Sequence, residues 1–293
     1  MSTATALATP PRHAPFAAWW RRHHDDAGSL AAAAPALVFL LVLYLVPVAL
    51  LLAQGFDGGL VHYRKALTDG LYVRVLLDTL LIAGCVSALC LLLAYPLAYA
   101  LAIVPAPWPA IGMALVLLPF WTSILVRTYG WMVLLGRNGL VNRALAGLGW
   151  IDNPLPLLNN WTGVLVGMTH VLLPYMVFPL YAAMRRVDAS LLSAARGLGA
   201  SGPQVFLRVF LPLTLPGVLA GVTLVFVLSI GFFITPALLG GGKVTMIAVL
   251  IEQQVRTFLE WGFASALSAV LLAATLVVYV LLRRLFRGNL QWH

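Results

Sequence analysis

The sequence predicts an all-α membrane protein with about six transmembrane helices, and three observations support this. Of its 293 residues, 62% are hydrophobic and only 9% are charged, whereas a soluble domain has roughly 25% charged residues. The apolar residues gather in runs of about 20, the length that an α-helix needs to cross the hydrocarbon core. Short polar segments rich in Pro, Gly and Arg separate these runs.

The chain is predicted to be one transmembrane domain, with a short polar segment before it and another after it in the sequence. Residues 1–29 are expected to be a cytoplasmic lead, disordered at first and then with a short interfacial helix around residues 16–20. Residues 30–287 form the predicted transmembrane domain, and residues 288–293 a cytoplasmic tail. The apolar run after the lead is long enough to stay in the membrane, which argues against a cleavable signal peptide.

Six apolar runs are the predicted spans. They cover residues 30–52, 75–103, 110–126, 161–184, 215–239 and 262–282. Residues 105–109 are predicted as a tight turn, and residues 54–74, 135–160 and 243–261 as outward loops. No internal repeat is visible.

A stretch between the fourth and fifth spans carries helix signals. Asp188 is predicted to cap a short helix by accepting from the free N–H groups of its first turn. Gly199 stands just after this predicted helix, where a residue with a left-handed backbone conformation commonly ends a helix. Ser201 and Gln204 form a capping-box pattern for a second short helix, which Pro212 is predicted to end. Small residues around the junction would let another protein approach closely.

The first of these short helices has one apolar face. Leu191, Ala194, Ala195 and Leu198 recur at i, i+3, i+4 and i+7, so they lie on the same side. Both chain termini are predicted to be cytoplasmic, because an even number of spans returns the chain to its starting side. The basic pairs at residues 185–186 and 283–284 adjoin span ends, where the positive-inside rule is strongest.

The sequence has no motif of a catalytic or nucleotide-binding site. It lacks a GxxxxGK[ST] loop for ATP, an HExxH pair and a GxSxG elbow, and no pair of carboxylates lies within a span. Its two cysteines, Cys85 and Cys90, lack metal-ligand spacing. We therefore expect no enzyme activity, metal or cofactor in this chain.

The stretch over residues 188–216 resembles the EAA loop of ABC-importer permeases. Ala194, Ala195 and Gly199 match the family's Glu-Ala-Ala and later Gly, and residues 210–212 match its hydrophobic–Leu–Pro ending. The resemblance implies the type I ABC-importer permease fold, in which this loop is a coupling helix that docks in a cleft of the ATP-binding subunit.

Two positions of this loop depart from the family pattern. Ser193 replaces the usual Glu, and Gly197 stands where an acidic residue is common. The coupling region as a whole is expected over about residues 185–212. The implied ATPase-coupling residues are Asp188, Leu191, Leu192, Ser193, Ala194, Ala195, Arg196, Leu198, Gly199, Ala200 and Pro212.

Further segments resemble the spermidine/putrescine-type permeases. Residues 118–123 and 127–131 look like the signature of their third span, and residues 229–241 are similar to their fifth-span motif. That family often has Gly-Asp-Phe where this chain has Gly-Phe-Phe at residues 231–233. The cargo therefore stays open between a polyamine and the cargo of related permeases, namely opines, phosphonates, ferric iron or thiamine.

The resemblance also implies the partners and the location. They are two ATP-binding subunits, a second permease subunit in a heterodimer and a periplasmic substrate-binding protein, at the inner membrane of a bacterium. The Arg, Tyr and Trp residues at the end of the third span suit either an interface anchor or a lining of the passage. The passage candidates are Asp78, Trp121, Ser123, Arg127, Tyr129, Phe232, Thr235 and Pro236.

An ion-coupled carrier acting alone is the alternative class, and an intramembrane enzyme is a third that the missing motifs argue against. Such a carrier has acids or His pairs deep in its spans and often internal symmetry. Here only Asp78 and His170 qualify, and they lie on different spans. Asp78 is also near enough to a span end to reach the interface, and His170 is predicted to hydrogen-bond a neighbouring helix.

Overall fold

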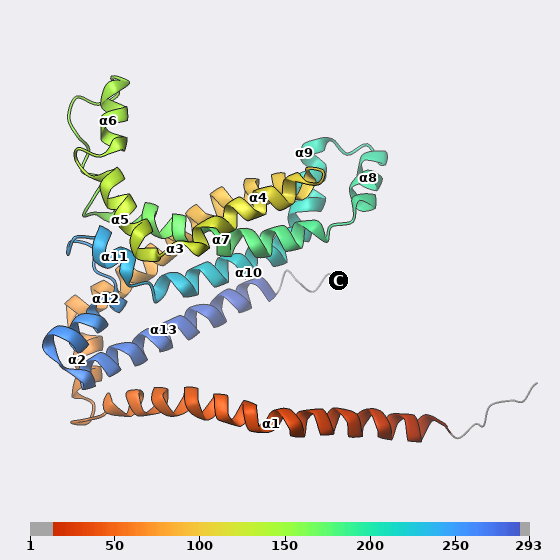
Figure 1. The fold of residues 1–293 in the computed structure, drawn as a ribbon, viewed down its shortest axis with the longest axis horizontal. Coiled ribbons are helices and arrows are strands. Elements are labelled where there is room, and N and C mark those ends of the chain that lie inside the picture. The colour runs from red at the N-terminus through yellow and green to blue at the C-terminus, as the bar shows by residue number, and fades with distance from the viewer. Residues whose placement is uncertain (1–13, 288–293) are drawn as a thin grey trace, which may run out of the picture. The chain divides into compact units, whose positions relative to one another are not determined.

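The computed structural model describes residues 14–287, which fold into helices and turns (Figure 1). The predicted C-terminal tail and the first part of the predicted lead lie outside these residues. The chain divides into two compact units, residues 1–53 and 54–293. The first is the single helix α1 (Ala14–Gln54), which includes residues 16–20, predicted as a separate short helix. Its segment Ala33–Gln54 is long and apolar enough to cross a membrane.

The second unit consists of consecutive helices. They are α2 (Val61–Thr68), α3 (Gly70–Ile103), α4 (Trp108–Leu117), α5 (Ile124–Leu135), α6 (Leu140–Gly147), α7 (Trp161–Arg185), α8 (Ala189–Gly197), α9 (Gly202–Val205), α10 (Leu211–Ile230), α11 (Ile234–Leu239), α12 (Ile247–Gln253) and α13 (Trp261–Arg287). Three shorter turns join some of them: the 3₁₀ turn η1 (Leu118–Trp121) and the π-helical turns η2 (Phe206–Phe210) and η3 (Gln254–Phe258).

The described helices agree with a polytopic membrane protein. Five of them are long and apolar enough to cross a membrane, and one sharply bent pair can be counted as a sixth span. The predicted second, fourth and sixth spans are confirmed as α3, α7 and α13, with differences of a few residues at their ends.

The core of the second unit forms where α3, α7 and α10 pack side by side (Figure 1). Glycines let α10 approach α7 closely. A Cβ added to Gly217 would lie 2.4 Å from the Cβ of Ala183, and one added to Gly221 would lie 2.6 Å from Sδ of Met176. Small residues four apart on one helix face are a common way for membrane helices to come together.

The predicted third span over residues 110–126 is not one continuous helix but a sharply bent pair. The helices on either side of the break at residues 122–123 are bent by 95°. Thr122 there has an extended backbone, with ψ of 142°, and its hydroxyl donates to the Pro119 carbonyl at 2.8 Å. A side chain that bonds the preceding turn in this way competes with the helical hydrogen-bond pattern, so the helix ends and restarts in another direction.

Pro212 does not end the second short helix, contrary to prediction. The chain stays helical from α9 through η2 into α10. The Leu211 N–H donates to the Phe206 carbonyl, five residues back. This wide turn relieves the clash that a proline ring makes with the carbonyl four residues before it in an α-helix.

The predicted fifth span and the loop after it also differ from expectation. The span over residues 215–239 is divided, because α10 ends at Ile230 and α11 starts at Ile234. The segment over residues 243–261, predicted as an outward loop, contains α12 and η3. The N–H of Ile247, at the start of α12, donates to the buried Thr79 hydroxyl of α3 at 2.9 Å, so this segment is packed into the protein.

Candidate functional site

The stretch between α7 and α10 folds as the helix signals predicted. Asp188 caps α8, since its Oδ1 accepts from the Ser190 N–H at 2.8 Å. This hydrogen bond from the backbone has the largest effect on the Asp188 carboxyl and lowers its pKa below the usual value. A hydrogen bond from the Ser190 hydroxyl lowers the pKa further. The carboxylate therefore stays charged at the N-terminus of α8, where negative charge is favourable.

The end of α8 reverses the chain tightly. Gly199 has a left-handed backbone, with φ of +87°. The Ala200 N–H donates to the Ala195 carbonyl at 3.1 Å and the Gly199 N–H to the Arg196 carbonyl at 2.9 Å, which is the Schellman arrangement. Two residues later, the Ser201 N–H donates to Oε1 of Gln204 at 2.8 Å and completes the predicted capping box.

The outer face of this helix pair is apolar and uncovered. Leu198 is 91% exposed and Leu191 is 49% exposed, while Ala194 beside them is exposed as well. Leu192 and Ala195 turn partly inward, and Leu192 packs against the core. An exposed apolar patch held by rigid caps is typical of a protein–protein contact.

A cluster of four aromatic rings joins the end of α3 to η2, directly after the short helices. The Tyr99 ring lies edge-on to Phe206 at 5.7 Å and to Phe210 at 5.2 Å, measured between centroids. Tyr95 meets Phe206 at 6.1 Å, and its hydroxyl lies 3.1 Å from that of Thr214. We call these rings, Tyr95, Tyr99, Phe206 and Phe210, the aromatic cluster.

Sequence reasoning missed the aromatic cluster, although a signal was present. Each helix carries its two rings four residues apart, Tyr95 with Tyr99 and Phe206 with Phe210, so each pair lies on one helix face. The cluster therefore connects α3 to the chain that follows α8 and α9.

Two passage candidates are buried within the chain. The Thr235 hydroxyl, on α11, lies 3.3 Å from that of Thr128 on α5. A Cβ added to Gly167 of α7 would lie 2.7 Å from Cγ2 of Thr235. Thr235 and its neighbour Pro236 are therefore packed between α5 and α7 in this conformation.

The other passage candidates are more open. Trp121 is 89% exposed and Tyr129 is 55% exposed, and Ser123 between them is exposed too. Phe232 is half-buried at the break after α10 and packs against the core. Asp78 is half-buried on α3.

Polar groups meet between α5 and α7. Trp131 Nε1 donates to Nδ1 of His170 at 3.1 Å, which confirms the predicted helix-to-helix hydrogen bond of this histidine. One turn earlier on α5, Nε of Arg127 is buried and has no hydrogen-bond partner in the described residues. Phe120 and Tyr175 also meet across η1 and α7, with centroids 5.0 Å apart.

The described residues contain no cluster of metal-ligating side chains. Among residues 14–287, no three His, Cys, Asp or Glu side chains lie close enough together to hold a metal ion. The ion pair that this part of the chain does contain, between Arg256 and Glu252 at 3.5 Å, is largely exposed.

Comparison with known proteins agrees with this geometry. The family model of binding-protein-dependent transport system inner membrane components matches residues 81–290. The spermidine/putrescine transport system permease protein PotB of Haemophilus influenzae is 36% identical over 271 residues, which is 87% of this chain and 95% of that protein. The PotB protein of Escherichia coli K12 is 38% identical over 233 residues, 78% of this chain and 84% of that one.

The fold also matches a solved structure. A chain of a bacterial alginate ABC transporter, crystallised with a periplasmic protein carrying an alginate pentasaccharide, aligns with a TM-score of 0.70 at 19% identity. The alignment covers 93% of this chain and 98% of that one, so the two share a fold. With the family model and the relatives in agreement, this chain belongs to the inner membrane components of binding-protein-dependent transport systems, the permeases of ABC importers.

Proposed function

We propose that this chain is the permease subunit of an ATP-driven polyamine importer and that α8 and α9 dock into its ATP-binding partner. The observation that carries this proposal is the rigid, uncovered apolar face around Leu191 and Leu198. A docking face on a membrane chain that lacks a nucleotide-binding motif suits a partner subunit that supplies the ATP. Of the ATPase-coupling residues named from the sequence, Leu191, Ala194 and Leu198 lie on this face, and Asp188 and Gly199 hold the two ends of α8.

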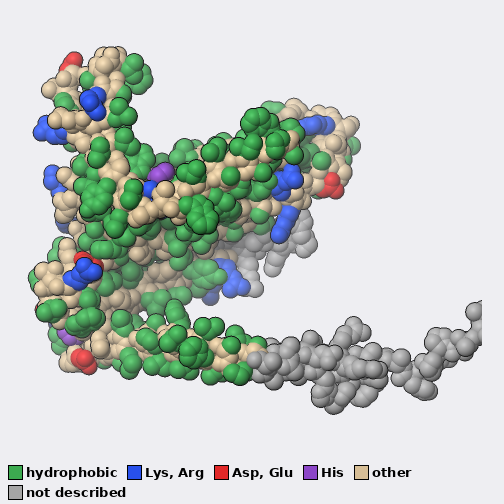
Figure 2. All heavy atoms as spheres, in the orientation of Figure 1, with side chains coloured by type: hydrophobic (Ala, Val, Ile, Leu, Met, Phe, Trp, Pro, Cys, Tyr) green, Lys and Arg blue, Asp and Glu red, His purple; other side chains and the backbone are tan. Residues whose placement is uncertain are grey.

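The topology supports a cytoplasmic position for this docking face. Helix α7 has 25 residues and is about 37 Å long, enough to cross the hydrocarbon core. α8 follows its C-terminal end, so it emerges on the opposite side from α6, which precedes α7 (Figure 1). Arg185, Arg186, Arg196 and Arg208 are exposed at the α8 end, where Figure 2 shows several basic side chains. Positive charge beside span ends favours the cytoplasm, and both chain termini would lie there too.

The proposed cycle uses the aromatic cluster as its link. ATP binding closes two partner ATPases, and the docked short helices move with them. The rings of Phe206 and Phe210 then press on Tyr99 and displace the end of α3. The passage changes from outward to inward access, and the cargo biases this change only through its different affinities for the two states.

The cargo is assigned from the relatives. Proteins named for spermidine and putrescine transport match most of this chain, and both compounds are small organic cations. One feature favours a second candidate. Phe232, which is partly buried, stands where that family often has an acid, and loss of this charge favours a less cationic cargo of the same permease class. The wider assembly would contain a second permease subunit and a periplasmic binding protein.

Transport by the reconstituted complex tests the proposal. The complex, purified with the subunits that accompany it, is placed in liposomes, and uptake of radiolabelled spermidine is followed with and without ATP. We expect ATP-dependent uptake that excess putrescine reduces. Uptake that needs an ion gradient but no ATP would instead favour a carrier acting alone. A complex that takes up a phosphonate in an ATP-dependent way, but does not take up spermidine, would favour the second candidate.

A further inference from the structure

Arg127 carries a positive charge close to the middle of the membrane. Trp131, one turn later on α5, bonds His170, and Phe120, before the break, meets Tyr175. Arg127 lies between these two contacts in the chain, and its guanidinium is near enough to Tyr175 and His170 to interact electrostatically with both. It is therefore level with the central part of α7.

The depth of this charge follows from α7, which is long enough to cross the membrane. Leu173 is the middle residue of α7, so His170 and Tyr175 lie within about 5 Å of the centre of the span along its axis. The hydrocarbon core extends about 15 Å to either side of its own centre. An arginine side chain is too short to bridge that distance, so the depth of Arg127 argues against an interface anchor.

The charge of Arg127 has no counter-ion in the part of the chain that the structure describes. The helices α4, α5, α7, α10 and α11 contain no Asp or Glu. The ion pair of the described residues lies elsewhere, between Arg256 and Glu252, and Nε of Arg127 is buried without a hydrogen-bond partner there. Charged residues within spans face the interior of a bundle or a water-filled cavity.

The break before Arg127 also fits a water-filled passage. The helix is interrupted at residues 122–123, and non-helical backbone at membrane depth occurs only where protein buries it or where it lines such a cavity. Trp121, Thr122 and Ser123 are all exposed, so no described segment of this chain buries the break. Arg127 itself is half-buried, which leaves part of its side chain open.

The sign of this charge is unusual for a passage that admits cations. Channels that conduct cations are commonly lined by rings of Asp or Glu, whereas an Arg repels small cations. The helices that surround Arg127 supply no acid to offset it. Such a passage does not attract Na⁺ or K⁺, which the membrane potential of a bacterium drives inward.

We propose that Arg127 is a charge barrier that keeps small inorganic cations from leaking through the passage while the polyamine is carried. This inference rests on the proposed function, because the barrier is needed only if this chain lines a passage. Spermidine still passes, since methylene groups separate its ammonium groups. Its apolar part lies opposite the guanidinium while an ammonium lies over an aromatic ring. Phe120, Tyr175 and Trp131 place such rings on either side of Arg127.

Sodium entry into liposomes that contain the assembled complex tests the barrier. Radiolabelled Na⁺ is driven by a membrane potential that is negative inside, with ATP and spermidine present so that the passage cycles. We expect the ratio of Na⁺ entering to spermidine taken up to rise at least about tenfold in Arg127→Gln. Arg127→Lys should keep the wild-type ratio at neutral pH and lose it at alkaline pH, because a buried lysine releases its proton more readily than an arginine.

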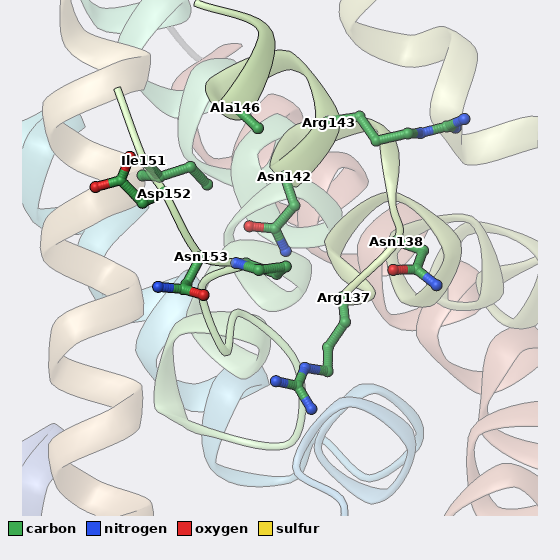
Figure 3. A pocket seen from close by; sticks show the side chains of 9 residues that line it. Arg137, Asn138, Asn142, Arg143, Ala146, Ile151, Asp152 and Asn153 are labelled. Atoms are coloured by element: carbon green, nitrogen blue, oxygen red, sulfur yellow. The ribbon is translucent and has the colours of Figure 1, made fainter. Parts of the chain in front are cut away.

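The control is Arg137→Gln, the same substitution at an exposed arginine just after α5, which borders a pocket of about 220 Å³ beside α6 (Figure 3). It should keep the wild-type ratio. An unchanged ratio in Arg127→Gln would overturn the barrier. So would loss of the second permease subunit from Arg127→Gln but not from Arg127→Lys, since the charge would then pair with a carboxylate of that subunit.

Two further outcomes are distinguishable from these. If Arg127→Gln does not reach the membrane, the alkaline response of Arg127→Lys decides, and its absence would contradict the barrier. Spermidine uptake by the wild type is measured first, because its failure would contradict the proposed function rather than the barrier alone.

Discussion

The ring of Tyr99, near the end of α3, meets Phe210 edge-on, with centroids 5.2 Å apart and planes 80° apart. Edge-to-face pairs of this kind contribute about 0.5–1.5 kcal/mol beyond the area that they bury. The contact joins a membrane-spanning helix to the π-helical turn that follows the short helices α8 and α9. It is one of the contacts in the described chain that connect the docking segment to the core, beside that of Leu192.

Replacing Tyr99 with Ala should separate ATP hydrolysis from transport. Without the ring, movement of η2 is no longer passed to α3, so we expect spermidine uptake to fall about tenfold or more while basal ATP hydrolysis stays within about twofold of wild type. The ratio of molecules transported to ATP hydrolysed measures this. Tyr99→Phe keeps the ring and should keep the ratio, and Tyr279→Ala, on α13, is the control. An unchanged ratio in Tyr99→Ala would exclude the coupling role of the cluster.

Replacing Gly199 with Val should disrupt the docking face through the backbone. Its φ of +87° is unfavourable for a β-branched residue, although a Cβ there would meet open space, and the strain costs about 1–3 kcal/mol. We expect reduced retention of the ATPase subunit and loss of uptake, with normal amounts of protein in the membrane. Gly197→Ala, within α8 and equally open, should behave as wild type. Full uptake by Gly199→Val would show that the tight turn is dispensable.

Replacing Gly217 with Ala should destabilise the packing of α10 on α7. The new Cβ would lie 2.4 Å from the Cβ of Ala183 and 2.8 Å from the Pro179 carbonyl. The helices must move apart, at a cost of about 1–3 kcal/mol. Thermal unfolding in detergent should show a lower midpoint, whereas Gly84→Ala, where nothing lies within 4 Å, should not lower it, because Ala is the better helix former. Equal midpoints would mean that the two helices are not in close contact.

Acidification should loosen the start of α8. The pKa of Asp188 is lower in the folded chain than in an unfolded one. Its contribution is therefore fully present above the usual Asp pKa and is lost as the pH falls through the lowered value. The protection of the Ser190 amide, measured as its hydrogen-exchange rate relative to that of an unfolded peptide at the same pH, should fall over that range. Asp188→Asn keeps a good cap without a charge, so its exchange should lack this additional acid dependence. The same acid response in both proteins would rule out titration of the cap.

The predictions that succeeded rest on local signals. The cap at Asp188, the left-handed turn at Gly199 and the capping box at Ser201 each depend on residues within one or two turns of the chain. The span over α7 follows from a continuous apolar run. These features form wherever the segment is placed, so the sequence alone predicts them.

The failures involve competition between local signals or contacts between distant segments. Pro212 ends a helix in isolation, but the π-helical turn before it accommodates the ring. The break at Thr122 depends on a hydroxyl bonding the previous turn in preference to water. The contacts of Tyr99 with Phe206, and of Ile247 with Thr79, join residues that are far apart in the sequence. No local pattern places such partners together.

Photo-crosslinking from position 198 tests the central claim most directly. Leu198 is replaced by a photoreactive benzophenone amino acid, the assembled complex is irradiated in native membranes, and the attached protein is identified by mass spectrometry. The proposed docking predicts a crosslink to the ATP-binding subunit, while the same amino acid at position 150 crosslinks to no ATP-binding subunit. A crosslink from position 198 only to lipid or to a periplasmic protein would contradict the coupling role of α8 and the orientation of the chain.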